Sequence, residues 1–425
     1  MTVQPDPPFA ADTGLPWDVE VTGDAVEAIG AARHRLGDTF AVRSGDDNYL
    51  FTFSPTGVES FYALPEERAS KGVADYLMLR RKLPDEIFDG RRVLPGTLFR
   101  RDDVATYLAN LEVALDATVS ELGPTGSVDA FGLTRRLGHR MGLASWAGPG
   151  CADGAEFDRL VRAFDTLDGS DAFVHPDTMA AVEASGKAAE RAALDDVTAI
   201  VGATVSQWQP GGDSLFGRIV AAWADAPTDT RLRGIAYDIA LIHIASMSNL
   251  AAALGWTLVD LLEHPATAEQ VVAGDADLAR RCALESTRLA QRSIMSRTVL
   301  KPISLDTGDV TYDVPPGWTV ATLLPLLNST AAPGLDSWNP DRWTGHRLAD
   351  VSALASVQLV TAFGHGRHSC PAQPFSLSAM TTAVTHLLGA YEMTPGWPAY
   401  PRPVPAQIGG VARAEGRCPI SYRAR

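Results

Sequence analysis

One short stretch of the chain holds the residues best suited to present a sulfur ligand to a metal-bearing cofactor. Cys370 lies in the sequence FGHGRHSCPA, residues 363–372, together with Gly364 and Gly366. Because glycine permits backbone conformations that other residues resist, this loop can bend tightly beneath a flat cofactor. A thiolate close to the start of a following helix also gains from the positive end of the helix dipole, which lowers its pKa. The alternative is a buried structural cysteine in a turn.

A second candidate group is ionic. Glu285 and Arg288 lie three residues apart within 277–291, where the periodicity predicts an amphipathic helix, so both side chains share one helix face. Arg342 follows in an aromatic-rich turn, WNPDRW, at 338–343. Taken alone, such a pair on a helix is more often a solvated surface pair than a functional group.

Length and composition indicate a compact globular protein. Of its 425 residues, 46% are hydrophobic and 20% are charged, with a formal net charge of −15. No basic stripe accompanies this acidic balance, so a nucleic-acid partner is not expected. The four cysteines form no CxxC pair, which argues against structural zinc and a disulfide framework and fits a reducing cytoplasm. The first 16 residues lack the features of a signal peptide.

The first part of the chain alternates helix and strand signals. We expect a helix over residues 25–36 and then two strands, 39–43 and 49–53, that pair as a hairpin. Ser54 and Pro55 then open another helix, because proline suits the first helical turn.

Helical periodicity dominates from residue 69 to about residue 301. The clearest segments are 104–122, 155–167, 178–205 and 215–224. The longest run, 231–263, is apolar almost all round and must therefore be buried. Its charge-free part, 239–259, is also a candidate membrane span, but it contains several polar side chains that are costly in lipid. We therefore expect a helix of a soluble core and no membrane association.

Residues 298–320 alternate in a β-like pattern and predict a second small sheet region, and 375–391 predict a last helix. The chain is thus expected to be mainly α with small β-sheet regions, as a single domain over residues 1–425. Its expected parts are a proline-rich leader at 1–24, a mostly β region at 25–70, a helical body at 71–295, and a β region with the cysteine loop and last helix at 296–425.

The order of these features resembles the cytochrome P450 family of haem-thiolate proteins. A long apolar helix is followed by the ExxR pair, the Asn-Pro-Asp-Arg turn, the FGxGxHxC loop and a final helix, over about residues 230–395. Resemblance in the N-terminal half is looser, with the segment from Phe88 to Arg92 in the place of the family's WxxxR motif. The resemblance as a whole implies the cytochrome P450 fold, a triangular prism-like helical body with haem between the long central helix and the cysteine loop.

By this resemblance, Cys370 would be the proximal thiolate ligand of the iron in haem b. Phe363 would pack beside the sulfur, while Gly364 and Gly366 would let backbone N–H groups approach it. Buried haem propionates need cationic partners. The matching positions are His368, Arg297 and Arg92. The family's buried charge network, which holds the cysteine loop, would consist of Glu285, Arg288 and Arg342.

The long helix departs from the family pattern at the positions that help deliver protons. Typical members have an acid followed by a threonine there, whereas this chain has Ser248 and Asn249, after Ala245. Asparagine cannot exchange a proton as readily as an acid or a hydroxyl. Three explanations stay open: the substrate or ordered water supplies the proton path, peroxide replaces O2 and electrons, or the haem performs coupling, dehydration, rearrangement or nitration. Asn249 could also simply satisfy a helix carbonyl.

The resemblance implies a monooxygenase that inserts oxygen into a small, largely apolar organic substrate. No flavin or nicotinamide fingerprint flanks the cysteine region, so the electrons would come from a separate ferredoxin or flavodoxin-type donor with its reductase. The divergent long helix suggests specialised (secondary) metabolism. We expect a cytoplasmic monomer.

Overall fold

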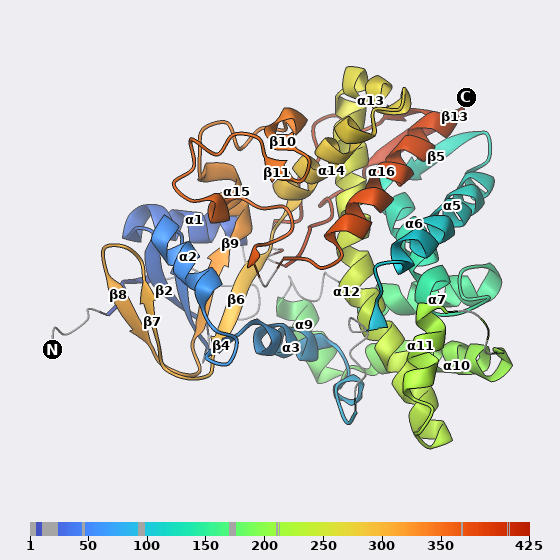
Figure 1. The fold of residues 1–425 in the computed structure, drawn as a ribbon, viewed down its shortest axis with the longest axis horizontal. Coiled ribbons are helices and arrows are strands. Elements are labelled where there is room, and N and C mark those ends of the chain that lie inside the picture. Colours follow the sequence, from blue (N-terminus) through green and yellow to red (C-terminus); the bar gives the residue numbers. More distant parts are fainter. Residues whose placement is uncertain are drawn as a thin grey trace.

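The computed structural model describes residues 6–10, 24–44, 47–91, 98–169, 176–209, 211, 213–366, 369–405, 407 and 409–425. Most strands lie on one side of the molecule and most of the long helices lie on the other, with the long helix α12 (Thr228–Glu263) between them (Figure 1). This mainly helical architecture with small sheets confirms the expected fold class. Arg92 and His368 lie outside the described residues.

The helical segments are bounded as follows. They are α1 (Ala25–Leu36), α2 (Pro55–Ala63), α3 (Lys71–Lys82), α5 (Asp103–Leu122), α6 (Ala130–Trp146), α7 (Gly154–Leu167), α9 (Pro176–Ala184), α10 (Ala188–Gln207), α11 (Leu215–Ala222), α12 (Thr228–Glu263), α13 (Pro265–Val272), α14 (Ala276–Ala290), α15 (Leu324–Thr330) and α16 (Gln373–Ala390), with short 3-10 turns at Asp85–Ile87, Pro340–Arg342 and Val357–Leu359.

The strands are short, as in many mainly helical proteins. They are β1 (Phe9–Ala10), β2 (Thr39–Ser44), β3 (Asp47–Thr52), β4 (Ala69–Ser70), β5 (Thr125–Asp129), β6 (Ile294–Val299), β7 (Ile303–Asp306), β8 (Thr311–Val314), β9 (Thr319–Leu323), β10 (Trp343–Thr344), β11 (Arg347–Leu348), β12 (Tyr391–Pro395) and β13 (Pro419–Ala424).

Local capping explains where several helices begin and end. The Asp24 carboxylate accepts the N–H groups of Val26 and Glu27 at the start of α1, as expected for an N-cap. The helix expected over 178–205 was wrong as a single element, because it divides into α9 and α10. Gly186 and Lys187 both adopt positive φ, 61° and 60°, and two left-handed residues in succession interrupt a right-handed helix.

The second small sheet region expected over residues 298–320 is confirmed in part, because the segment forms strands but only some of them make a sheet of their own. Strands β6 and β9 join the N-terminal hairpin in one sheet of order β1-β2-β3-β9-β6-β4, with β3 and β9 parallel. Only β7 and β8 pair apart from it in this region. Alternation in the sequence marks a strand but does not identify its partner, which explains the difference. The β5, β12 and β13 sheet was not expected.

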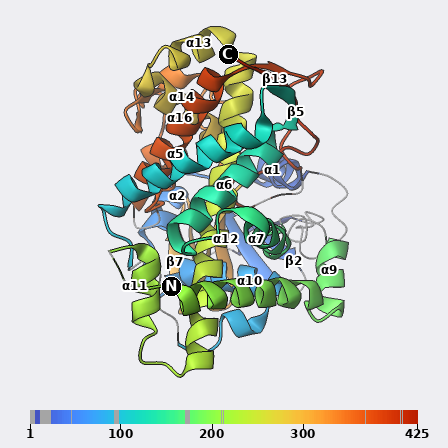
Figure 2. The ribbon, with the colours of Figure 1, turned by 90° about the vertical axis from the view of Figure 1, so that its right-hand side faces the viewer.

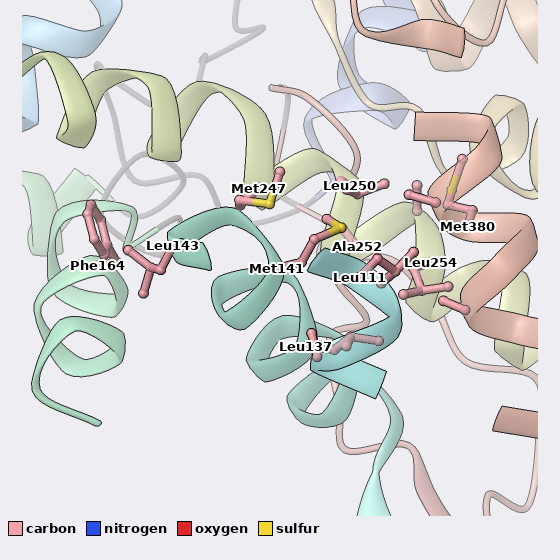
Figure 3. Close-up of a cluster of buried hydrophobic side chains, with 14 of the residues drawn as sticks. Leu111, Leu137, Met141, Leu143, Phe164, Met247, Leu250, Ala252, Leu254 and Met380 are labelled. Carbon is pink, nitrogen blue, oxygen red and sulfur yellow. The ribbon is translucent and has the colours of Figure 1, made fainter. Parts of the chain in front are cut away.

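Helix α12 runs through the main hydrophobic core. Apolar side chains from α5, α6, α12 and α16 meet there, among them Leu111, Met141, Leu254 and Met380 (Figure 3). At Gly142 in α6, an added Cβ would lie 2.8 Å from the Met247 side chain, so this glycine lets α6 approach α12 closely. That approach sets the polar residues of α6 against the centre of α12.

Among the described residues, α12 is the one helix that is long and apolar enough to cross a membrane. The mean hydropathy of its most apolar stretch is 1.5, and 67% of that stretch is buried inside the fold. Burial of this extent is typical of a core helix, which accounts for the apolar composition.

Candidate active site

The cysteine loop is closed by its own backbone. The Cys370 N–H donates to the Phe363 carbonyl at 2.7 Å, and the Ser369 N–H donates to the Gly366 carbonyl at 3.2 Å. Gly364 and Gly366 adopt φ values of 79° and 58°, in the left-handed region that glycine enters without penalty. The two glycines are therefore needed for the turn that presents the thiol.

The Cys370 sulfur is half-buried just before α16. Burial raises the pKa of the thiol, and the nearby backbone N–H groups of Ala372 and Gln373 act in the opposite direction. The expected net lowering by the helix start was thus wrong for the free thiol, because desolvation outweighs the effect of these groups. A half-buried sulfur beside backbone N–H groups in a glycine-flanked loop still fits a thiolate ligand, since a bound metal cation lowers the pKa further.

Glu285 is the centre of a buried ionic network. Its carboxylate accepts two bonds from Arg288, at 2.9 and 2.7 Å, and one from the Nε of Arg342 at 3.0 Å. The indole N–H of Trp343 and the backbone N–H of Asn339 also donate to it, at 2.9 and 3.1 Å. The side chains of Glu285 and Arg288 are both 0% exposed. The structure thus brings together the three residues that the sequence singled out.

This network continues to the cysteine loop through two residues that the sequence did not suggest. Arg288 donates to the backbone carbonyl of Asn328, and the Asn328 side chain exchanges two hydrogen bonds of 2.9 Å with the Thr361 backbone. The Thr361 hydroxyl in turn donates to the Gly364 carbonyl and accepts from the Phe363 N–H, both at 3.1 Å. A continuous series of hydrogen bonds therefore joins Glu285 to the loop of Cys370.

Arg297 lies on β6, buried, with its guanidinium among backbone carbonyls. It donates to the carbonyls of Leu64 at 2.6 Å and Ala69 at 3.3 Å, and its charge lies over the Phe61 ring. Its expected contact with a haem propionate stays a prediction, as do the roles of Arg92 and His368.

A cavity of about 690 Å³ opens between the central part of α12 and the main sheet. Its walls include Ala245, Ser248 and Asn249, the three α12 residues predicted from the sequence. Apolar wall residues are Leu77, Met78, Leu79, Met179, Ile244, Ile294 and Met295. Polar and charged residues make up as much of the wall, among them Asp47, Lys71, Asp75, Arg81, Asp168, Ser293, Ser296, Thr298, Thr319 and Gln407. A cavity of this size, lined by both apolar and polar side chains, can hold a small organic molecule that carries polar groups.

Asn249 contacts a distant segment of the chain. Its Oδ1 accepts the backbone N–H of Val411 at 2.8 Å, and an added Cβ at Gly410 would lie 2.1 Å from that oxygen. The hydrogen-bond partner of the Asn249 side chain is therefore a backbone N–H in the C-terminal part of the chain. It is not the helix carbonyl that the sequence analysis considered. In this arrangement the amide oxygen ties α12 to the segment 409–411.

We expect Asn249→Leu to lower the free energy of unfolding by about 1–3 kcal/mol, because it strands the buried Val411 N–H without an acceptor. Asn249→Asp keeps an oxygen at that position, so its free energy of unfolding should fall by less. Urea denaturation of both variants measures the difference. Equal stability of the leucine variant and the unchanged protein would show that the bond contributes nothing.

Across the described residues, no group of three or more His, Cys, Asp or Glu side chains could hold a metal ion. A metal presented to Cys370 would therefore need further ligands from a cofactor.

No protein-family model matches the chain. It is 26% identical over 209 residues to 24-hydroxycholesterol 7-alpha-hydroxylase of Homo sapiens, which covers 44% of this chain and 43% of that protein. It is 30% identical over 139 residues to sterol 14-demethylase of Arabidopsis thaliana, covering 31% and 28% respectively. It is 28% identical over 215 residues to cytochrome P450 monooxygenase ataF of Aspergillus terreus, covering 43% and 42%. The aligned part spans less than half the length of each of these relatives.

Proposed function

We propose that this chain, which is similar to cytochrome P450 proteins over less than half of their length, is a haem-thiolate monooxygenase of that family in which Cys370 binds the iron of haem b. The observation that carries the proposal is the hydrogen-bonded connection from the buried Glu285 network to the glycine loop of Cys370. Such a connection holds the loop of Cys370 in one position. A structural cysteine in a turn would not need its loop to be held in this way.

Bound haem would supply the activation of oxygen, and its thiolate ligand would favour O–O cleavage. The residues of this chain would do three things: Cys370 would bind iron, the N–H groups of Ala372 and Gln373 would stabilise the thiolate, and Arg297 would offer a cation near the sheet. The cavity beside α12 would hold the substrate and limit the entry of water.

The substrate is proposed to be a small, largely apolar organic molecule with a few polar groups. The aliphatic and thioether side chains in the cavity wall support an apolar part of the substrate, and hydroxyls of Ser293, Ser296 and Thr298 could orient a polar group. Two of the relatives are named for reactions on sterols, which fits a rigid apolar substrate. A place in specialised (secondary) metabolism is part of the proposal.

We further propose that electrons come from a separate ferredoxin or flavodoxin-type protein with its reductase, and that the protein is a cytoplasmic monomer without a membrane or nucleic-acid partner. The net charge of −15 supports the last point, since an acidic chain gains little from contact with phosphates.

The second candidate is a haem-thiolate enzyme with other chemistry: peroxide-driven oxidation, coupling, rearrangement, dehydration or nitration. The observation in its favour is that Asn249, which stands where the family has a threonine, uses its amide oxygen to hold the Val411 N–H, and an amide does not exchange a proton as readily as a hydroxyl.

The carbon monoxide complex of the reduced holoprotein tests the proposal first. We expect the Soret band of a thiolate-ligated haem, and a band typical of histidine ligation would reject the assignment of Cys370. Product formation with a ferredoxin donor, NAD(P)H and O2 then separates the two candidates. A product formed only with peroxide, or without either oxidant, would favour the second.

A further inference from the structure

Asp168 is a carboxylic acid in the cavity wall that neither the sequence analysis nor the proposed function uses. It follows the last residue of α7 and lines the cavity together with residues of α12. Helices α6 and α7 both pack against α12 (Figure 2), which brings the end of α7 to the cavity. The Asp168 side chain is 15% exposed, so the protein does not cover it completely. The cavity thus has a carboxylate on the side of α7.

Asp168 shares its cationic partner with a second carboxylate. Arg135 of α6 donates from Nη1 to Asp168 Oδ2 at 3.2 Å and from Nε to Asp165 Oδ1. In these two contacts each acid uses a single oxygen, whereas the strong form of an arginine–carboxylate contact is bidentate. Arg135 therefore compensates the charge of Asp168 only in part.

Two buried histidines beside this group carry no charge, because their hydrogen bonds fix their protons. The Trp146 indole donates to His243 Nδ1 at 3.3 Å, so the proton of His243 is on Nε2. That Nε2 donates to His139 Nδ1 at 2.8 Å, and the other ring nitrogen of His139 donates to Asp165 at 3.3 Å. Each ring thus has one acceptor nitrogen and is neutral, and burial lowers the pKa of both histidines. Neither histidine compensates the second carboxylate.

A second cation near Asp168 is engaged by other groups. Lys82 of α3 is 2% exposed and pairs with Glu190 of α10 at 3.2 Å. It also donates to the carbonyl of Leu167 at the C-terminal end of α7, where the helix dipole is negative. Arg135 and Lys82 therefore face three carboxylates and a helix C-terminus. The wall around Asp168 has a surplus of negative charge, and burial raises the pKa of this acid.

The other charged residues of the wall do not change this balance. They are two acids and two bases, Asp47, Asp75, Lys71 and Arg81. Lys71 and Asp75 pair with each other on α3.

Gln407 supplies a second acceptor in the same wall. It is 8% exposed, and its Nε2 donates to the carbonyls of Gly409 at 2.7 Å and Val411 at 3.5 Å. These carbonyls fix the orientation of the amide, because the opposite orientation would place its oxygen against them. Among the described residues, the Oε1 of Gln407 has no hydrogen-bond partner. A buried acceptor of this kind is costly until a donor binds it.

We propose that the substrate is an apolar amine and that Asp168 binds its ammonium group in the cavity. An ammonium group brings the positive charge that the wall around Asp168 lacks, and further donors on the same molecule can satisfy the Oε1 of Gln407. A metal ion does not fit this place, since no group of three metal-ligating side chains occurs among the described residues. The inference rests on the proposed function, because it names the class of substrate that the monooxygenase takes.

Three probes that share one apolar cage test the inference. Adamantylmethylamine, adamantylmethanol and adamantane carboxylate are cationic, neutral and anionic at neutral pH. We expect calorimetric titration of the holoprotein to give an affinity for the amine about 10–100-fold above that for the alcohol, the usual range for a hydrogen bond to a charged group. The carboxylate should bind most weakly. Equal affinities for the amine and the alcohol, or tighter binding of the carboxylate, would overturn the proposal.

Asp168→Asn should remove the preference for the amine and keep the affinity for the alcohol. Asp158→Asn is the matched control, because Asp158 is also on α7, is half-exposed and pairs with Arg136 at 3.0 Å, but does not line the cavity. This control changes the net charge by the same amount and should keep the preference. Equal losses in both variants would show an effect of net charge and would reject the contact with Asp168.

The absorption spectrum distinguishes this site from direct binding at the iron. An amine that ligates haem iron shifts the Soret band to longer wavelength and would keep its affinity in Asp168→Asn, a result that would overturn the assignment to Asp168. An abnormal carbon monoxide spectrum, together with loss of the amine preference in Asp168→Asn, would instead count against the proposed function and leave the amine site in place.

Discussion

Replacing Cys370 with alanine is expected to remove the Soret band of thiolate-ligated haem from the reduced, carbon monoxide-bound protein and to abolish oxygen insertion. The reason is that the described residues hold no cluster of metal-ligating side chains that could take over the iron. Cys370→Ser should keep the closed loop, because the bonds that close it are made by the backbone. The absorbance spectrum and the haem content of each purified variant measure the effect.

Cys151→Ser is the control for this experiment. Cys151 is buried and its thiol donates to the Ala147 carbonyl at 3.2 Å, a bond that a serine hydroxyl can also make. We expect the carbon monoxide spectrum of this variant to be the same as that of the unchanged protein. Retention of normal haem binding and a thiolate-type band in Cys370→Ala would contradict the assignment.

Glu285→Ala is expected to yield protein with little bound haem and to lower the free energy of unfolding by about 3–5 kcal/mol. The variant leaves Arg288 buried without a counter-charge and removes the shared acceptor of Arg342, Trp343 and Asn339. Because Arg288 also contacts Asn328, the cysteine loop should lose its order at the same time. Urea denaturation and the ratio of haem to protein absorbance report the two effects separately.

Glu285→Gln keeps the shape of the side chain and should recover part of the stability. Glu392→Ala removes a surface ion pair in which Arg423 and Glu392 are 76% and 57% exposed, and we expect a loss of at most about 1 kcal/mol. Normal haem content in Glu285→Ala would contradict the role of the network. An equally large loss of stability in Glu392→Ala would show that the effect of Glu285→Ala is not specific to the buried network.

Much of the local structure could be predicted from the sequence, since it depends on neighbouring residues. The bounds expected for the first helix, 25–36, agree with α1, where Asp24 provides the cap. The spacing of Glu285 and Arg288 placed both on one face of α14, and the structure joins them. The division at Gly186 and Lys187 was missed, because their left-handed conformations leave little mark in hydrophobic periodicity.

The sequence by itself determined the cysteine loop, its two glycines and the ionic residues that precede it, because these are short motifs with fixed spacing. Only the tertiary structure decided what surrounds the cavity. The sheet joins strands some 270 residues apart in the chain, such as Tyr49 and Thr319. Asp168 and Ser248 line one cavity because α7 packs against α12, an arrangement set by helix packing and not by any periodic pattern.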